Sequence, residues 1–301
     1  MKQNHWLQWN VPVLKKSISV KEYLRDQKGM SLTTLKSAKM NGSILCDGRP
    51  VTVRHMLQGG EVLHISLPAA PLPSSIPLCS LPLEILFEDE HVLIINKPPH
   101  LPTMPGRGEE KESLAGAVLQ YYVNQNLPSS FHAVSRLDRQ TSGIVAIAKH
   151  TYAHQRLADF FQKGIGKKYY IGIVNGRWEQ PEGIINRPIA RKPDSIIEHQ
   201  VHPAGKQAKT GYKVEKTVCG HDVTRFTLYT GRTHQIRVHT AFAGHPLIGD
   251  SLYGNRSELI QRQALHAAKL QFCHPVFESW HTITADLPED MRRLIEDELT
   301  L

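Results

Sequence analysis

The sequence has few cysteines and no long hydrophobic run, and both absences narrow the classes of protein that it can represent. Its four cysteines, at positions 46, 79, 219 and 273, are far apart and form no Cys-x-x-Cys pair. This spacing argues against a zinc site or a disulfide framework and indicates a reducing compartment. No apolar run approaches the ~18 residues that can span a bilayer, and the N-terminus lacks the apolar core of a signal peptide. We therefore expect a cytoplasmic protein with no membrane partner.

The motifs that bind common cofactors are also missing. The sequence contains no P-loop, no dinucleotide-binding fingerprint and no pattern that pairs a serine or cysteine nucleophile with a histidine. His234 and His239 are five residues apart, a spacing that does not bring them to one helical face, and no His-Glu-x-x-His motif accompanies them. We therefore expect neither a cofactor nor a bound metal.

What the sequence does have is an uneven excess of positive charge. The formal net charge is +8 over 301 residues. Residues 162–216 hold eleven Lys or Arg against five Asp or Glu, whereas residues 288–301 are acidic. Because the excess is concentrated in one segment, it favours a basic surface with an acidic polymer as its partner.

A proline-rich segment divides the chain into two predicted units. Residues 68–82 contain five prolines, which is typical of a semi-rigid linker. Residues 1–67 before it are expected to form a small αβ module, whose core would be marginal by itself. Its expected elements are helices at Val20–Gln27 and Ser31–Met40, the second capped by Ser31, and strands at Ser43–Cys46 and Val62–Leu67.

The larger unit, residues 83–301, mixes helices and strands without regular βαβ alternation. This order favours an α+β fold with a largely antiparallel central sheet. The expected strands are Val92–Ile95, Ile144–Lys149, Lys168–Val174, Val223–Tyr229 and Trp280–Ala285. Two of the expected helices have predicted N-caps, Ser113 for one and Thr233 for another that ends near Ala243. Two more begin at Thr151, with Leu157, Phe160 and Phe161 in the core, and at Pro288.

One acidic residue is prominent in the loop Ala133–Gly143, which reads AVSRLDRQTSG. Asp138 lies between Arg136 and Arg139, just before an apolar strand. The default interpretation of such a cluster is a surface salt bridge. A carboxylate between two guanidinium groups is nevertheless expected to be ionised and well positioned, because nearby opposite charges favour its charged form.

Two further stretches combine basic and aromatic residues. In GKKYYIGIVNG, residues 166–176, strand alternation turns Tyr169 and Tyr170 to opposite faces, so that only one of them can enter a given site. In TGRTHQIRVHT, residues 230–240, Arg232 and Arg237 lie near the start of a predicted helix. The helix dipole disfavours an exposed cation there by about 0.3–1 kcal/mol. A nearby anion would relieve this cost, and both Asp138 and an RNA phosphate are candidates.

These stretches resemble the motifs of a known enzyme family. RLDRQTSG, KYYIGIVNG, GRTHQIRVHTAFAGHPLIGDSLYG and LHAAKLQFCHP occur in the order found in the RluA-type RNA pseudouridine synthases, over about residues 83–298. The family fold is a mixed, mainly antiparallel sheet with a central active-site cleft. In the first unit, NGSILCDGRPV and GGEVLHI resemble the alpha-L RNA-binding module that precedes many RNA-modifying domains.

The resemblance implies roles for particular residues. Asp138 matches the catalytic aspartate, Tyr170 the tyrosine that packs on the target uracil, and Arg237 the basic residue that pairs with the aspartate. Lys97 and Pro98 match a first motif with a structural role. The RNA contacts that we expect are Arg136, Arg139, Thr141, Lys168, Arg232, His234 and Gln235. Three positions depart from the family pattern. Ser135 stands where many members have His, His100 where Gly is usual, and Met104 where His is common.

The expected function is therefore the isomerisation of specific uridines in RNA to pseudouridine by a monomer without a cofactor. Ribosomal RNA is the first expectation for the substrate, and transfer RNA is the alternative. Asp138 would act on the ribose, either as a nucleophile at the anomeric carbon or as a base on the 2′ proton. The rival interpretations are a non-catalytic RNA-binding or ribosome-assembly protein and a metal-dependent nuclease or hydrolase.

Overall fold

The computed structural model describes residues 5–68, 71–106, 112–127, 129 and 131–296. The helices are α1 Val20–Glu22, the π-helix η1 Tyr23–Gln27, α2 Leu32–Asn41, α3 Leu114–Asn124, α4 Thr151–Gln162, α5 Gln235–Phe242 and α6 Glu289–Glu296. The strands are β1 His5–Asn10, β2 Ile18–Ser19, β3 Ser43–Cys46, β4 Arg49–Pro50, β5 Met56–Leu57, β6 Val62–Leu67, β7 Glu84–Glu88, β8 Val92–Lys97, β9 His132–Ala133, β10 Ser142–Ala148, β11 Lys167–Val174, β12 Glu182–Asn186, β13 Ile189–Arg191, β14 His199–Val201, β15 Lys209–Val218, β16 His221–Leu228, β17 Leu265–Cys273 and β18 Trp280–Thr284.

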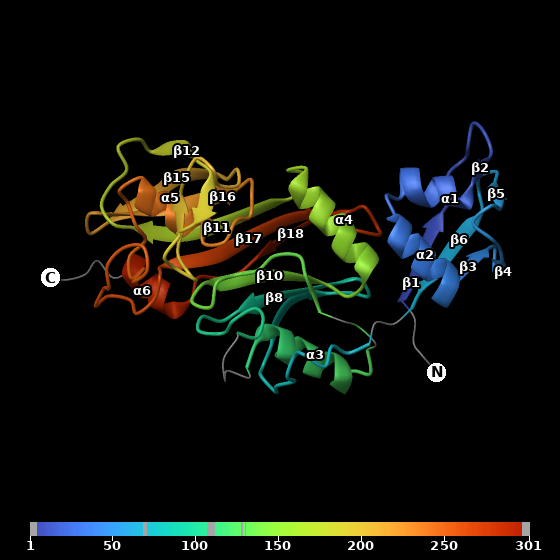
Figure 1. Ribbon diagram of the computed structural model, residues 1–301, viewed down its shortest axis with the longest axis horizontal. Coiled ribbons are helices and arrows are strands. Elements are labelled where there is room, and N and C mark those ends of the chain that lie inside the picture. The colour runs from blue at the N-terminus through green and yellow to red at the C-terminus, as the bar shows by residue number, and fades with distance from the viewer. Residues whose placement is uncertain (1–4, 69–70, 107–111, 128, 130, 297–301) are drawn as a thin grey trace.

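The N-terminal part of the chain builds a small sheet in the order β1-β6-β3-β4, with α1, η1 and α2 packed against it (Figure 1). Strand β1 was not expected from the sequence, although its buried Leu7 and Trp9 alternate with exposed residues. The predicted cap of α2 is confirmed, because the Ser31 side chain accepts a hydrogen bond from the Thr34 amide. The segment predicted as one helix at Val20–Gln27 is divided into α1 and η1.

The larger sheet follows the order β12-β15-β16-β11-β17-β10-β8-β7 within the described residues, with β18 beside β17 and β9 beside β10. Every pairing in it is antiparallel except β10 with β17, which is parallel over two residue pairs. Gly143 makes that pairing possible, because it has φ +107° and a Cβ there would lie 2.4 Å from a backbone atom of Ala267. The predicted α+β fold with a mainly antiparallel sheet is confirmed.

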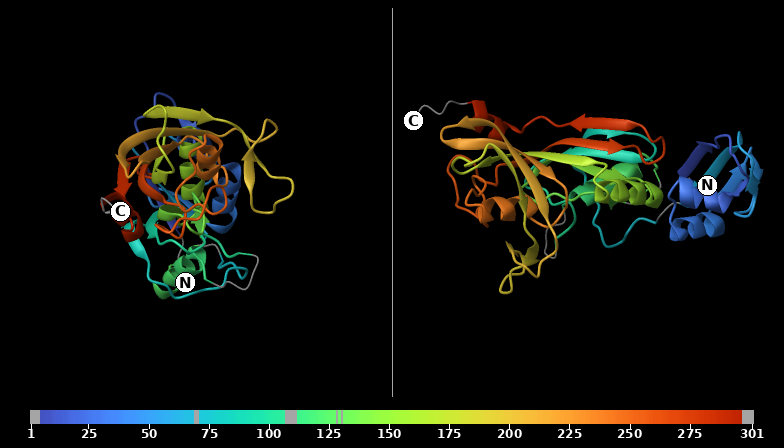
Figure 2. Two further views of the ribbon diagram at one scale, coloured as in Figure 1. Left: turned by 90° about the vertical axis from the view of Figure 1, so that its left-hand side faces the viewer. Right: turned by 90° about the horizontal axis from the view of Figure 1, so that it is seen from above.

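Helices α4 and α5 lie on the same side of the large sheet (Figure 2). The predicted cap of α3 is present, since the Ser113 side chain accepts from the Gly116 amide. Helix α4 begins at Thr151 as predicted, and the His150 ring caps it by accepting from the Ala153 amide. The core lies between the sheet and these helices, around the buried strands β8 and β10.

Residues 71–82 form neither helix nor strand, and Ala69 and Ala70 lie outside the described residues. The small sheet has a hydrophobic core largely of its own, to which Tyr152 and Val276 of the larger part also contribute. The division into residues 1–67, 68–82 and 83–301 stays a prediction. Among the helices that the structure describes, none is long and apolar enough to cross a membrane.

Candidate active site

A pocket of about 860 Å³ opens beside the loop that precedes β10, strand β11, helix α4 and the start of α5. This volume lies within the range of small-molecule sites in proteins. The catalytic and RNA-binding positions predicted from the sequence all lie in its lining, namely Arg136, Asp138, Arg139, Thr141, Lys168, Tyr170, Arg232, His234, Gln235 and Arg237. Segments far apart in the sequence therefore meet at one site.

Asp138 lies in the loop between β9 and β10, and four consecutive carbonyls of this loop each accept a different donor. Thr103 Oγ1 donates to the Leu137 carbonyl at 2.8 Å, and the Thr141 amide donates to the Asp138 carbonyl at 3.0 Å. The donors to the next two carbonyls are Lys97 Nζ, 3.3 Å from the Arg139 oxygen, and Arg262 Nη1, 3.1 Å from the Gln140 oxygen. The loop backbone is thus fixed on both sides of Asp138.

The Asp138 carboxylate is held by Arg237, which comes from the first turn of α5. Arg237 Nη1 donates to Asp138 Oδ2 at 3.0 Å, so the pair predicted from the sequence is present in the structure. The same guanidinium makes two bonds of 2.8 Å to Asp250, whose side chain is almost fully buried. Burial opposes the charge, but the two carboxylates raise the pKa of Arg237 further above its ordinary value. Arg237 therefore remains a cation that bridges a buried and a pocket-facing carboxylate.

Tyr170 extends from β11 into the pocket and is only 6% exposed. Burial, together with the negative charge of Asp138, raises the pKa of its hydroxyl above the ordinary value. The phenol is therefore neutral at physiological pH. Tyr169 faces the other side of the sheet, where its hydroxyl donates to Gln271 at 3.2 Å, and the predicted alternation is confirmed.

Lys168 follows the same alternation as Tyr170 and also lines the pocket. Its ammonium lies 4.2 Å from the ring centroid of Phe161, which is a cation–π distance. Burial lowers the pKa of Lys168 to about 8. Phe161 was expected to be only a core residue, but it is partly buried and borders the pocket. Helix α4 therefore contributes to the site as well as to the core.

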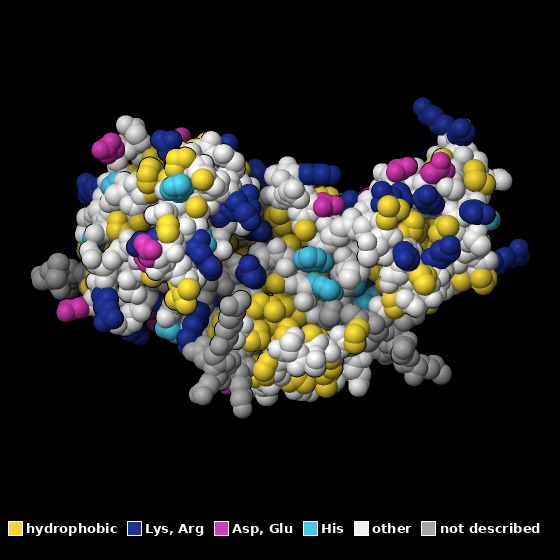
Figure 3. Space-filling view, viewed as in Figure 1, with side chains coloured by type: hydrophobic (Ala, Val, Ile, Leu, Met, Phe, Trp, Pro, Cys, Tyr) yellow, Lys and Arg dark blue, Asp and Glu magenta, His cyan; other side chains and the backbone are white. Residues whose placement is uncertain are grey.

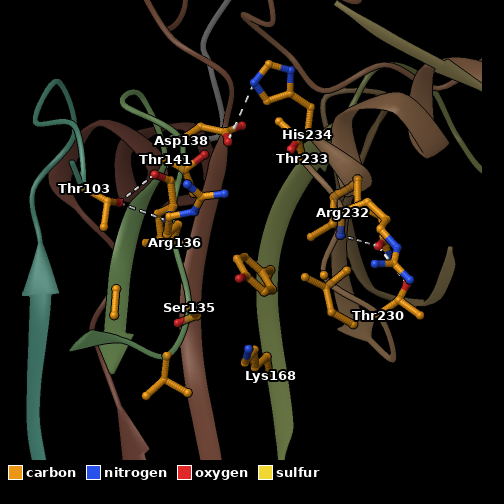
Figure 4. A pocket seen from close by; sticks show the side chains of 18 of the residues that line it. Thr103, Ser135, Arg136, Asp138, Thr141, Lys168, Thr230, Arg232, Thr233 and His234 are labelled. Carbon is orange, nitrogen blue, oxygen red and sulfur yellow. Dashed lines mark hydrogen bonds and ion pairs between the residues drawn. The ribbon is translucent and has the colours of Figure 1, made fainter. Parts of the chain in front are cut away.

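The predicted N-cap Thr233 is wrong. The capping residue of α5 is His234, which has a left-handed conformation with φ +54° and makes no side-chain capping bond. This conformation directs the His234 ring toward Asp138, with Nε2 3.8 Å from Oδ1 (Figure 4). Tyr253 accepts from the His199 amide and lies 2.8 Å from His234 Nδ1, so it can donate to that nitrogen and leave the imidazole N–H on Nε2. Burial lowers the pKa of His234, which favours this neutral form.

Two of the predicted RNA contacts are hydrogen-bonded inside the protein. The Gln235 side chain is 3% exposed, and its amide is bonded to Thr210, Thr230 and the backbone of Lys209 and Arg232. The Thr141 side chain is also buried and accepts from Gln263 at 3.1 Å. Because these polar atoms have partners inside the protein, the two side chains support the pocket wall, and their contact with RNA stays a prediction.

The three remaining arginines lie at the exposed rim. Arg139 Nε donates to the His100 carbonyl at 3.2 Å, and Arg232 Nε donates to the Gln207 carbonyl at 2.9 Å. His100 has φ +65°, a conformation in which the glycine usual in the resembling family would be unstrained. The other two departures from that family, Ser135 and Met104, line the pocket.

The sequence interpretation missed several residues that shape the site. Asp250 follows Arg237 by 13 positions and is placed beside it by the turn after α5. Tyr253 lies under the Arg237 guanidinium at 5.0 Å from its ring centroid. Asp250 lies within the GDSLYG stretch of the sequence, but no spacing in that stretch pointed to Arg237. Among the described residues, no group of three or more His, Cys, Asp or Glu is arranged to hold a metal ion.

The chain is similar in sequence to known proteins. Residues 91–242 match the family described as RNA pseudouridylate synthase. The chain is 42% identical to an uncharacterised RNA pseudouridine synthase of Bacillus subtilis strain 168, YjbO, over 93% of this chain and 99% of that protein. It is 35% identical to the ribosomal large subunit pseudouridine synthase D of Escherichia coli K12, over 92% and 84%.

The fold is also found among solved structures. Human RNA pseudouridylate synthase domain containing 1 superposes with a TM-score of 0.57 and 22% identity, over 72% of this chain and 86% of that one. At this identity the likeness shows the fold alone.

Proposed function

The chain belongs to the RNA pseudouridine synthase family, and from this premise we propose that it converts specific uridines of ribosomal RNA to pseudouridine with Asp138 as the catalytic carboxylate. The observation that carries the proposal is the Asp138 side chain in the pocket, held 3.0 Å from Arg237. The relatives named for the large ribosomal subunit favour ribosomal over transfer RNA as the substrate.

The reaction is an isomerisation in which no atom of the nucleotide is lost overall. The bond between uracil N1 and ribose C1′ breaks, the base turns within the site, and C5 forms a new bond to C1′. C5 releases its proton to solvent and N1 gains one, so the step needs no oxidant and no hydrolysis. Asp138 acts on the ribose, by attacking C1′ or by removing the 2′ proton. A 2′-deuterium isotope effect on turnover distinguishes the second route from the first.

The neighbours of Asp138 supply orientation and charge. Arg237 pairs with the carboxylate and directs it into the pocket, because its own position is fixed by two bonds to Asp250. The neutral His234 presents its Nε2 toward the other carboxylate oxygen. Tyr170 is uncharged and offers a flat surface on which the uracil packs. In the free enzyme it does not act as a phenolate base.

The rim of the pocket provides the contacts to the RNA backbone. Arg136, Arg139 and Arg232 are exposed there, and Lys168 lies deeper on the pocket wall. These cations bind phosphates around a uridine that has been flipped out of its stack, which costs a few kcal/mol and least in a loop or bulge. The N-terminal residues 1–67 add a second RNA-binding module, joined through residues 68–82 to the catalytic domain 83–301. We expect a cytoplasmic monomer that works without a metal.

The proposal is tested by mapping pseudouridine in total RNA from a strain that lacks the gene. We expect one or a few sites of large-subunit ribosomal RNA to lose the modification and to regain it when the gene is restored. A lost site in transfer RNA would replace the proposed substrate. An unchanged map would contradict the proposed activity in that cell.

The role of Asp138 is tested with RNA that carries tritium at uracil C5. Asp138→Asn keeps the size of the side chain but removes its negative charge, and we expect release of tritium to fall by about 1,000-fold or more. Asp26→Asn, on the exposed surface of the N-terminal module, is the matched control and should release tritium at the wild-type rate. Wild-type rates in Asp138→Asn would refute the assignment. The wild-type protein should also keep full activity in EDTA, as expected of a reaction without a metal.

A further inference from the structure

Helix α4 connects the pocket to the N-terminal module. Near its C-terminal end, Ala158, Phe161 and Gln162 line the pocket. On an earlier turn of the same helix, Tyr152, Gln155 and Arg156 face the residues that precede α2. Phe161 lies six positions after Gln155, which corresponds to a rise of ~9 Å along the helix axis. One short rigid element therefore touches both the site and the module (Figure 1).

The contact between α4 and the module is built from hydrogen bonds to fixed backbone groups. Gln155 Nε2 donates to the Gly29 carbonyl at 2.7 Å, and Gln155 Oε1 accepts from the Ser31 amide at 3.0 Å. The Tyr152 hydroxyl donates to the Lys28 carbonyl at 2.8 Å. Because Ser31 is the N-cap of α2, these bonds fix the start of that helix relative to α4.

Apolar packing and an ion pair complete this contact. Tyr152 is fully buried in the hydrophobic core of the module, and its ring meets Trp9 edge-on at 5.6 Å. Val276 is buried in the same core. Nearby, Glu278 pairs with Lys28 at 3.3 Å. Apolar burial of this kind is not screened by salt, so the contact should persist at ionic strengths that release nucleic acid.

The outer face of α2 is suited to an RNA backbone. Leu32, Lys36, Lys39 and Met40 recur at helical spacing on the side away from the buried Thr34, Leu35 and Ala38, and the two apolar residues are 60% and 67% exposed. The sequence holds no Asp or Glu from residue 27 to residue 46, so this face carries uncompensated positive charge.

This face and the pocket lie on the same side of the molecule. Helices α1 and α2 are on the side of their sheet that corresponds to the position of α4 and α5 on the large sheet (Figure 2). The N-terminal module and the larger part of the molecule are two lobes in the view of Figure 1. Lys and Arg side chains gather on both lobes, with His side chains and a hollow between them (Figure 3). One RNA molecule can therefore contact both lobes at once.

We infer that α4 is a strut which holds the α2 face at a fixed position relative to the pocket, so that uridines are selected by the geometry of an RNA that spans both. Gln155 and Tyr152 are positioning residues in this arrangement, and Lys36 and Lys39 bind phosphates of the flanking RNA. The inference rests on the proposed function for the identity of the reaction, but not for the binding of RNA.

The first test measures binding of deproteinised large-subunit ribosomal RNA to the full chain at several salt concentrations. The double variant Lys36→Glu/Lys39→Glu should bind about ten-fold more weakly. The slope of log Kd against log salt should fall by about 2, since each lost phosphate contact removes roughly 0.9. The control is Lys167→Glu, an equally exposed lysine whose strand position points away from the pocket, and it should keep the wild-type slope. Equal slopes in all three proteins would overturn the inference.

The second test concerns the strut. Tritium release is compared between ribosomal RNA and a ~5-nucleotide fragment centred on the target uridine, whose flanking nucleotides extend only ~7 Å on either side when stacked and do not reach α2. In Gln155→Ala, the ratio of KM for the long RNA to KM for the fragment should rise several-fold, and hydrogen exchange at the Ser31 amide should accelerate. A merely structural defect would raise both KM values together and would refute the strut. If the wild type bound RNA without releasing tritium, the proposed function would fail, while the salt slopes and the exchange at Ser31 would still decide the inference.

Discussion

At the scale of single residues, the site depends on an arginine with two carboxylate partners. Arg237 uses Nε and Nη2 for Asp250 and keeps Nη1 for Asp138. A lysine could not replace it, because a single ammonium lacks the planar fork that grips one carboxylate while donating to another. The buried partner Asp250 fixes the direction of the guanidinium and leaves Asp138 as the carboxylate that faces the pocket.

Tyr170 allows stacking and hydroxyl chemistry to be separated. Tyr170→Leu removes the aromatic face, and since a stacked base is worth about 1–3 kcal/mol, KM for RNA should rise about 10- to 100-fold. Tyr170→Phe keeps the face, so KM should stay within about two-fold of the wild type. Because burial and Asp138 raise the pKa of the hydroxyl, the wild-type rate should show no step from tyrosine ionisation below pH 10. Similar KM values in the Leu and Phe variants would contradict a stacking role.

The residues that the sequence could identify are those that occur in recognisable motifs. Asp138 and Arg237 are 99 positions apart, and their pairing followed from the family resemblance and not from local spacing. The helix-dipole argument added that Arg237 needed an anion. It could not say that Asp250 supplies a second one, because that contact depends on a turn whose path no local pattern specifies.

At the scale of elements, the loop that carries Asp138 is held by side chains from three separate segments. Lys97 ends β8, Thr103 lies in the loop that follows it, and Arg262 precedes β17. Arg262 in turn makes two bonds, of 2.7 and 2.9 Å, to Asp290 on the C-terminal helix α6. The position of α6 is therefore transmitted through one buried guanidinium to the backbone beside Asp138.

This connection predicts a catalytic effect from a residue that lies outside the pocket. Asp290→Ala leaves the buried Arg262 without its carboxylate, and we expect a loss of about 2 kcal/mol in the free energy of unfolding. The loop should move enough to lower kcat about ten-fold. Urea unfolding and tritium release on the same preparations measure both effects.

The neighbouring residue provides the control. Glu289 lies on the same helix, but it is exposed and pairs with the exposed Arg292 and Arg293. Glu289→Ala should change stability by less than about 0.5 kcal/mol and leave kcat unaltered. If Asp290→Ala behaved like Glu289→Ala, α6 would have no part in positioning the loop.

The elements themselves were predicted unevenly, for physical reasons. Helices with a serine cap, α2 and α3, were located correctly because the cap is a local interaction. The N-cap of α5 was misplaced by one residue, because His234 is held in a left-handed conformation by contacts to Tyr253 and Asp138 that only the tertiary fold creates. Strand β1 was overlooked because its alternation is short and lies at the chain terminus.

At the scale of the whole molecule, the seam between the two lobes contains buried histidines. His91 and His150 are 2% and 4% exposed, and His91 Nδ1 lies 3.0 Å from His150 Nε2. The Ala153 amide donates to His150 Nδ1, so the proton of a neutral His150 is on Nε2 and is donated to His91. His5 of β1 lies against this pair, with its ring centroid 5.1 Å from that of His150. Both lobes therefore enclose a histidine pair that is complete only when each ring is neutral.

This pair predicts a loss of stability in mild acid. Burial lowers the pKa of His91 to about 4 and that of His150 well below its ordinary value, whereas both rings titrate near 6.5 in the unfolded chain. Between about pH 6.5 and pH 4 the unfolded state binds protons that the folded state does not. The free energy of unfolding should therefore fall as pH falls, by up to about 1.4 kcal/mol per pH unit for each ring.

His150→Asn tests this prediction. It keeps a capping side chain for α4 but removes one titrating group, so the acid dependence of its free energy of unfolding should be shallower by about one proton. His55→Asn, at an exposed position, should retain the wild-type dependence. Urea unfolding at pH 7, 6, 5 and 4.5 measures all three proteins, and an unchanged slope in His150→Asn would show that this seam does not carry the acid sensitivity.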